Sequence, residues 1–74
     1  MTFTELYEHI YTGEGNSQDK QAALEPVDRM AWQIYRVLAG RKGFDWWWND
    51  IEDEDKNEIF DEFREIVRRG LAGV

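Results

Sequence analysis

The sequence predicts an all-α protein, a small bundle of three main helices with one or two short helical turns. Three observations support this prediction. Apolar residues recur at i, i+3, i+4 and i+7 in three separate segments. Almost no segment alternates apolar and polar residues with the period of two that is typical of strands. Residues that start and stop helices flank the periodic segments. Because 74 residues can bury only one small core, we expect a single domain over residues 1–74.

The first predicted helix begins after Thr2, which forms a capping-box pattern with Glu5 three residues later. The glycine-containing loop 13–16 ends it. A second short segment is expected to begin with Ser17 as its N-cap and to run to Leu24. The apolar stripe of the first helix consists of Phe3, Leu6, Tyr7, Ile10 and Tyr11.

The strongest predicted helix runs from Pro26 to Ala39 and ends at Gly40. Proline suits the first turn of a helix because the first amide groups have no intrahelical partner. Trp32 and Tyr35 lie beside the apolar stripe and widen it. The stripe predicted to face the core consists of Val27, Met30, Ala31, Ile34, Val37 and Leu38.

Three consecutive tryptophans, Trp46, Trp47 and Trp48, follow Asp45, which we expect to cap a single helical turn. Consecutive helical residues point about 100° apart, so the three side chains cannot all enter one core. We expect at least one to close the bundle and at least one to stay near the surface. Since tryptophan is enriched in binding hot spots, all three are candidate anchors for a partner.

The last predicted helix runs from about Glu52 to about Leu71. Its acidic first turn and its basic last turn, with Arg68 and Arg69, both complement the helix dipole. Its predicted apolar face consists of Ile59, Phe60, Phe63, Ile66, Val67 and Leu71.

The composition excludes several classes of protein. With no cysteine, disulfides and thiolate metal sites are impossible, and a reducing cytoplasm is the expected location. A core this small points to good helix packing or self-association. No apolar run is long enough to span a bilayer, and the N-terminus lacks the pattern of a secretory signal. A net charge of -7 repels phosphate backbones and anionic lipids, so neither nucleic acid nor a membrane is the expected partner.

The sequence also offers little for catalysis or for a cofactor. His9 is the one histidine and Ser17 the one serine, so a catalytic triad has almost no candidates. A calcium loop starting at Asp53 fails because Glu58 stands where glycine is required, and a start at Asp50 fails too. We therefore expect a protein that is not an enzyme and that holds neither a metal nor a cofactor.

Charge is segregated along the chain. Residues 44–65 hold ten acids and two bases, a net of -8, whereas the rest holds six acids and seven bases. One interpretation is a solvated face that keeps an aromatic-rich protein soluble. The other is complementarity to a basic partner, with carboxylates standing in for the phosphates of a nucleic acid. The candidate acidic face consists of Asp53, Glu54, Glu58, Asp61, Glu62 and Glu65.

A weaker pattern joins Arg36, Arg41 and Lys42 with the neighbouring tryptophans. Basic side chains and aromatic rings together could hold a nucleotide by phosphate contacts and stacking. The alternative is that Arg41 and Lys42 only complement the C-terminus of a helix.

The run from Arg41 to Ile51, followed by the acidic helix from Asp53 to Arg69, resembles small acidic accessory proteins of bacteriophages. These include anti-CRISPR and other anti-defence inhibitors. The resemblance covers about the last thirty residues and transfers no functional residue. It implies an inhibitor in the host cytoplasm that occupies a basic, nucleic-acid-binding surface of a host defence protein, by mimicry or steric block. Two alternatives stay open: an oligomeric sponge for a small nucleotide messenger, and a structural or adaptor protein that self-associates.

Overall fold

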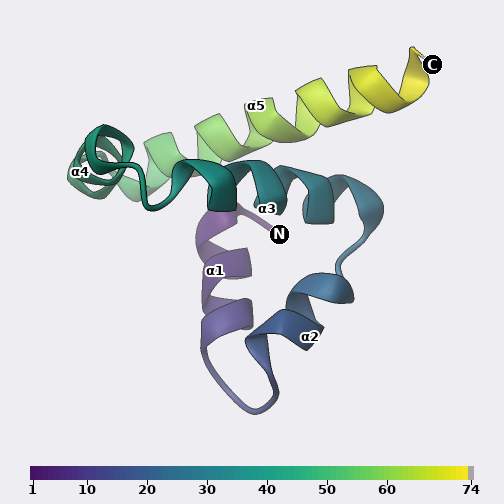
Figure 1. Ribbon diagram of the computed structural model, residues 1–74, viewed down its shortest axis with the longest axis horizontal. Coiled ribbons are helices and arrows are strands. Elements are labelled where there is room, and N and C mark those ends of the chain that lie inside the picture. Colours follow the sequence, from purple (N-terminus) through teal and green to yellow (C-terminus); the bar gives the residue numbers. More distant parts are fainter. Residues whose placement is uncertain (74) are drawn as a thin grey trace.

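The computed structural model describes residues 1–73, which form five α-helices and no strand (Figure 1). The all-α prediction is confirmed. The predicted set of three main helices with one or two short turns matches only roughly, because α4 is as long as α1. The helices are α1 (Phe3–Tyr11), α2 (Ser17–Ala22), α3 (Pro26–Leu38), α4 (Lys42–Asp50) and α5 (Asp53–Ala72).

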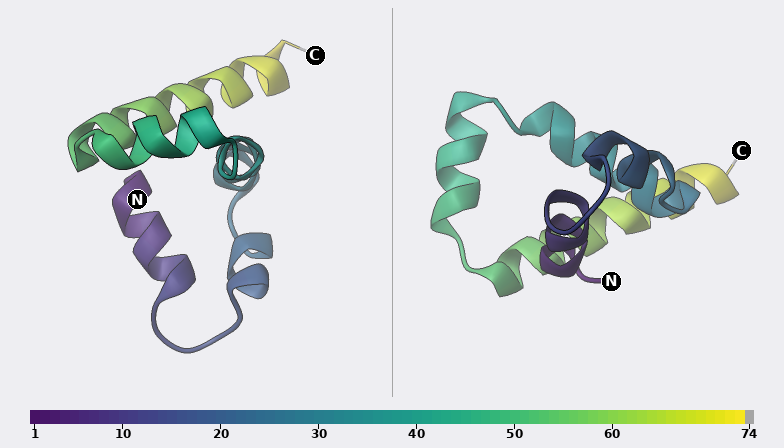
Figure 2. Two further views of the ribbon diagram at one scale, coloured as in Figure 1. Left: turned by 60° about the vertical axis from the view of Figure 1, so that its left-hand side comes forward. Right: turned by 90° about the horizontal axis from the view of Figure 1, so that it is seen from below.

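The two longest helices, α3 and α5, contact each other and cross obliquely; the right-hand view of Figure 2 shows them converging near the start of α3 and diverging toward its end. The N-terminal end of α1 lies against this pair, and α2 leads the chain from α1 back to α3. α4 spans the distance between the end of α3 and the start of α5 (Figure 2, right). In Figure 1 the C-terminal end of α5 extends beyond the other helices. Among the helices of residues 1–73, none combines the length and the apolar character needed to cross a membrane.

Local hydrogen bonds explain where α1 and α2 begin. The predicted capping box is present: Thr2 Oγ1 accepts from the Glu5 amide at 3.3 Å, and Glu5 Oε1 accepts from the Thr2 amide at 3.2 Å. The predicted cap of α2 is wrong by one residue. Asn16 is the N-cap, because its side-chain oxygen accepts from the Gln18 amide at 2.7 Å, and Ser17 is the first helical residue. α2 also ends earlier than predicted, at Ala22.

The start of α4 differs most from the prediction. Asp45 was expected to cap a single turn, but α4 begins at Lys42 and is nine residues long. Both carboxylate oxygens of Asp45 lie 3.0 Å from the amide nitrogen of Gly40 and accept its N–H. Gly40 has a φ of +98°, a conformation that favours glycine and ends α3 at Leu38. Asp45, a residue of α4, therefore stabilises the turn between α3 and α4.

An aromatic cluster forms the core. Its centre is Phe3, whose ring centroid lies 4.9 Å from that of Tyr35, 5.1 Å from Trp48 and 5.3 Å from Phe60. Edge-to-face and tilted contacts of this kind stabilise aromatic pairs beyond the area that they bury. The buried hydrophobic residues are Phe3, Leu6, Ile10, Ala31, Trp32, Trp48 and Phe60.

The prediction of which face of α3 lines the core is largely wrong. Of the predicted stripe only Ala31 is fully buried, whereas Val37 is 64% exposed and Met30 is 38% exposed. Trp32, which was placed beside the stripe, is 1% exposed and packs between Phe3 and Phe60. Aromatic side chains bury more apolar area than aliphatic ones, and the free energy gained on burial is proportional to that area.

The predicted apolar face of α5 is confirmed as far as Phe63, and Val67 beyond it is half-buried. The bounds of α5 agree with those expected, Phe60 is fully buried, and Ile59 and Phe63 pack against the core. Ile66 is 60% exposed and Leu71 is 50% exposed, although both were assigned to the apolar face. Both follow Arg64, the residue through which α5 bonds to Asp28 of α3.

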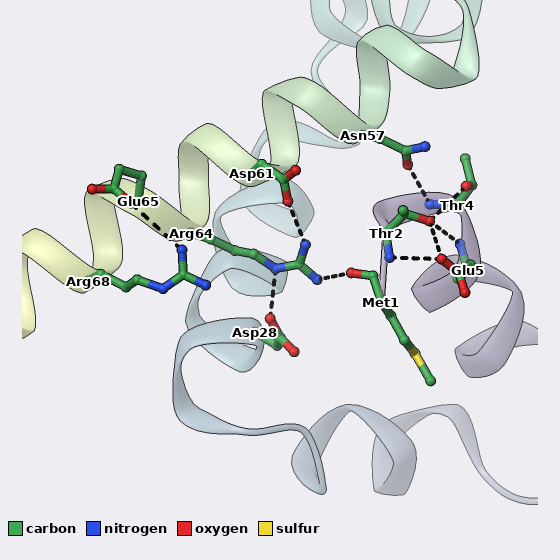
Figure 3. Close-up of polar contacts among 10 residues, drawn as sticks. All are labelled: Met1, Thr2, Thr4, Glu5, Asp28, Asn57, Asp61, Arg64, Glu65 and Arg68. Carbon is green, nitrogen blue, oxygen red and sulfur yellow. Dashed lines mark hydrogen bonds and ion pairs between the residues drawn. The ribbon is translucent and has the colours of Figure 1, made fainter.

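A buried arginine ties the N-terminus, α3 and α5 together (Figure 3). Arg64 is 6% exposed. It donates from Nε to Asp28 at 2.7 Å, from Nη1 to Asp61 at 2.7 Å, and from Nη2 to the carbonyl of Met1 at 2.6 Å. Its guanidinium carbon lies 4.7 Å from the centroid of the Phe60 ring. Three separate acceptors satisfy this buried charge, as a buried ion requires.

Candidate functional site

The outward side of α5 carries the candidate acidic face. Phe60 and Arg64 point into the protein, and a turn of 100° per residue places Glu58 and Glu62 on the opposite side of the helix. All six residues of the candidate acidic face are exposed. The fold therefore leaves this face accessible to a partner.

Half of the six predicted carboxylates are paired within the chain. Asp61 accepts from Arg64, and Glu65 lies 3.7 Å from Arg68 (Figure 3). Asp53 lies 3.6 Å from Lys56 Nζ, and Glu65 also lies 3.5 Å from Arg69. These ion pairs neutralise part of the field that the composition suggests.

Glu54, Glu58 and Glu62 form no ion pair in residues 1–73, and their spacing of four places them in one row along α5. Asp55 is also exposed and unpaired in this part of the chain. It was left out of the predicted face, although its spacing of three from Glu58 and seven from Glu62 could have included it. We call Glu54, Asp55, Glu58 and Glu62 the acidic row.

The charge density of the acidic row is close to that of a nucleic-acid strand. At a rise of about 1.5 Å per residue, the row spans about 12 Å and carries one charge per about 4 Å. One strand of B-DNA carries one phosphate per about 3.4 Å of helix axis. The row can therefore present a similar field to a basic surface.

The tryptophan run divides between surface and core, as the helical rotation predicts. Trp46 is 76% exposed, Trp47 is 50% exposed and Trp48 is 4% exposed. The Trp48 ring packs against Phe3 and stacks on Phe44 at 5.2 Å between centroids. Trp48 is therefore removed from the candidate anchors, because its side chain is part of the core. Trp46 and Trp47 are available to a partner.

The three basic residues of the alternative nucleotide site are divided between α3 and the start of α4. Arg36 donates from Nη1 to the Tyr11 hydroxyl at 2.7 Å and so points toward α1. Arg41 is the N-cap of α4 and Lys42 is its first residue. Arg41 and Lys42 also follow the C-terminus of α3, where the Arg41 amide donates to the Leu38 carbonyl at 3.0 Å. The alternative, that these two cations complement the C-terminus of a helix, therefore stays a prediction.

A cleft of about 430 Å³ opens where α1, α3, α4 and α5 meet. Phe3 and Trp48 line its floor but are only 3% and 4% exposed, because the rings cover one another. Burial, with smaller effects of neighbouring Tyr7 and Tyr11, raises the pKa of Tyr35 to about 12, so its hydroxyl stays neutral. The rim carries both Lys56 and acidic side chains. The cleft thus offers a ligand little apolar surface and no single sign of charge.

No three histidine, aspartate or glutamate side chains of residues 1–73 gather closely enough to hold a metal ion. No protein-family model matches the chain, and searches among curated proteins and solved structures find no match either. The case for a function therefore comes from the surface of this chain.

Proposed function

We propose that the chain is a non-enzymatic binding protein, an inhibitor of phage origin that occupies a basic, nucleic-acid-binding surface of a host defence protein. The observation that carries the proposal is the acidic row on the outward side of α5. Its four carboxylates have no ion pair in residues 1–73, so their field is directed at the surroundings. A basic surface would meet them much as it meets the phosphates of a nucleic acid.

The pattern of charges supports binding over solubility alone. Glu54 and Glu58, and Glu58 and Glu62, are like-charge pairs at i, i+4. Each such pair destabilises a helix by about 0.2–0.5 kcal/mol, whereas alternating signs would be equally soluble and would stabilise it. A basic partner would neutralise these charges and remove the repulsion. Binding therefore explains why like charges occur at this spacing, whereas solubility does not.

The exposed tryptophans supply an apolar anchor next to this charge. Trp46 and Trp47 lie on α4, which ends at Asp50, and α5 begins at Asp53. A tryptophan buries about 150–250 Å² when it is covered, and tryptophans dominate many binding hot spots. We infer that charge guides the encounter and that the tryptophans hold the complex.

The test is capture of partners from a nuclease-treated bacterial lysate with the purified chain as bait, at low and at high salt. The captured protein should bind nucleic acid, should be displaced by a DNA duplex, and should be retained less well at high salt. A triple variant, Glu54→Gln, Glu58→Gln and Glu62→Gln, should reduce capture about tenfold or more while circular dichroism stays helical.

A matched triple variant serves as the control. Glu8→Gln, Glu14→Gln and Glu25→Gln change the net charge by the same amount at exposed positions outside the row. Capture should survive in this control. Equal weakening by both triple variants would mean that only net charge matters, and a captured protein that a DNA duplex cannot displace would contradict mimicry.

A further inference from the structure

The outer side of α3 carries an apolar stripe that the fold covers only in part, with Met30 and Val37 exposed and Ile34 and Leu38 half-buried. Its residues follow the spacing i, i+3, i+4, i+7 and i+8, which is the spacing of a seam between two packed helices. They line a shallow surface groove of about 430 Å³. None of them belongs to the core of residues 1–73 or packs against it. The outer stripe consists of Met30, Gln33, Ile34, Val37 and Leu38.

The chain also exposes more surface than a folded monomer of its size. Its accessible surface is 5389 Å², against about 4,800 Å² expected for 8.9 kDa. Its radius of gyration is 12.6 Å, against about 11.3 Å for a compact domain of 74 residues. Met30 and Val37 of the outer stripe contribute to this excess, as do exposed apolar residues of α4 and α5. The excess, about 600 Å², is of the same order as the roughly 800 Å² that each partner of a standard interface buries.

The charge of the outer stripe indicates what covers it. The stripe contains no charged residue, although 34% of the chain is charged. A basic partner would gain nothing from this face. Two copies of the chain, each with a net charge of -7, repel each other wherever their acidic segments meet. A neutral, apolar face is where two like-charged copies can approach.

We propose that the outer stripe of α3 is a homodimer interface, in which two copies pack α3 against α3 in antiparallel orientation about a two-fold axis. A two-fold interface joins the same patch on both copies. With the axis between Gln33 and Ile34, Met30 of one copy lies opposite Val37 of the other. The Gln33 carboxamides then lie near the axis, where a polar residue in an apolar seam sets the register. This interface uses other residues than the acidic row, so either proposal can fail alone.

Sedimentation of the full chain over a range of concentrations tests the dimer. We expect a dissociation constant of about 1–100 µM, because the repulsion between two acidic chains weakens the apolar contact. Val37→Glu should weaken the dimer about thirtyfold or more, since it places a charge on each copy at the seam. Because Val37 is 64% exposed in the isolated chain, the variant should keep its helicity and its melting temperature when dilute.

Leu71→Glu is the matched control, because Leu71 is similarly exposed at 50% but lies on α5, outside the stripe. This variant should dimerise like the parent chain. A parent chain that stays monomeric up to about 1 mM overturns the proposal. So does a dimer that survives Val37→Glu, or one that Leu71→Glu disrupts to the same extent.

Cysteine cross-linking tests the orientation without a charged variant and covers the case in which Val37→Glu does not fold. The chain has no cysteine of its own, so Met30→Cys and Val37→Cys each introduce a single thiol. A disulfide requires Cα atoms about 4.4–6.8 Å apart. Oxidation of a mixture should link Met30→Cys to Val37→Cys in preference to either variant with itself. Preferential self-linking of each variant would indicate parallel packing and would contradict the proposed geometry.

Discussion

The two faces of α3 differ in composition and in fate. The inner face carries Trp32 and Tyr35 and is covered by α1 and α5, whereas the outer stripe carries Ile34 and Val37 and faces outward. Both faces repeat with the helical period, and the aliphatic face looks the more continuous in the sequence. The difference teaches that periodicity identifies residues that share a face but does not say which face is buried.

The aromatic face is buried because it has a partner of the same kind. Trp32 lies within 5.8 Å of the Phe3 ring and 5.1 Å of the Tyr35 ring, centroid to centroid. Phe60 approaches the same cluster from α5 at 5.3 Å from Phe3. These rings come from three helices, so their contacts arise only when the helices meet. The outer stripe has no such complement within residues 1–73.

The largest effect should come from breaking the inner face. Trp32→Ala should lower the free energy of unfolding by about 3–5 kcal/mol, because the large side chain is 1% exposed. A chain of 74 residues has only about 4–11 kcal/mol in total, so this variant should lose a large share of its stability. Urea denaturation followed by circular dichroism measures the loss. Met30→Ala on the outer stripe is the control and should cost less than about 1 kcal/mol. Equal losses would show that the two faces do not differ.

The second largest loss of stability should come from breaking the ion pairs between Arg64 of α5 and its partners, which include Asp28 of α3. Arg64→Ala removes the cation between Asp28 and Asp61 and should cost about 2 kcal/mol. The figure is below that for a fully buried pair because the Asp28 side chain is 27% exposed. The same denaturation measurement applies. Arg68→Ala, whose side chain is 57% exposed, should cost less than about 0.5 kcal/mol. A similar cost for both variants would contradict a structural role for Arg64.

A smaller effect, limited to alkaline pH, should come from Tyr35 on the inner face. Burial raises its pKa to about 12 in the folded chain, above the value of about 10 in the unfolded chain. Its contribution to stability is therefore complete below about pH 10 and is lost as the pH rises through about 12. Melting temperatures measured over this range should fall less in Tyr35→Phe than in the parent chain. Identical pH dependence in both would mean that the Tyr35 hydroxyl is not desolvated.

The smallest effect should come from the outer stripe of the isolated chain. Val37→Ala should change the free energy of unfolding by less than about 0.5 kcal/mol in dilute solution, since Val37 is 64% exposed. Measured again in concentrated solution, the same variant should be clearly less stable than the parent if α3 forms the dimer seam. A cost above 1 kcal/mol in dilute solution would show that the outer stripe is packed within one chain.

The sequence predicts helix boundaries correctly where the interactions that set the boundary join residues close together in the chain. Thr2 and Glu5 are three residues apart, and proline opens α3 through its own ring. The errors at Ser17 and Asp45 are also informative. The sequence pattern allows Asn16 as well as Ser17 to cap α2, and the hydrogen bond from the Gln18 amide selects Asn16. The pattern likewise does not show that Asp45 accepts from the Gly40 amide and so lies inside α4 instead of capping it.

The candidate site was foreseen in outline and changed in detail. The outward acidic side of α5 and the divided tryptophan run both follow from helical rotation. Spacing could have told which carboxylates stay unpaired, because each ion pair within α5 joins residues three or four positions apart. Glu58 and Glu62 have no lysine or arginine at those positions. Trp48 could not be told from Trp46 without knowing where Phe3 lies.

Helical content, helix ends and the segregation of charge are properties of residues within about four positions of one another, and the amino-acid order specifies them directly. The buried face of α3 and the partners of Arg64 depend on contacts between residues far apart in the chain. Arg64 bonds to Asp28 across 36 positions and to Met1 across 63. Such contacts exist only when several helices pack at once, so the assembled fold decides them and local pattern cannot.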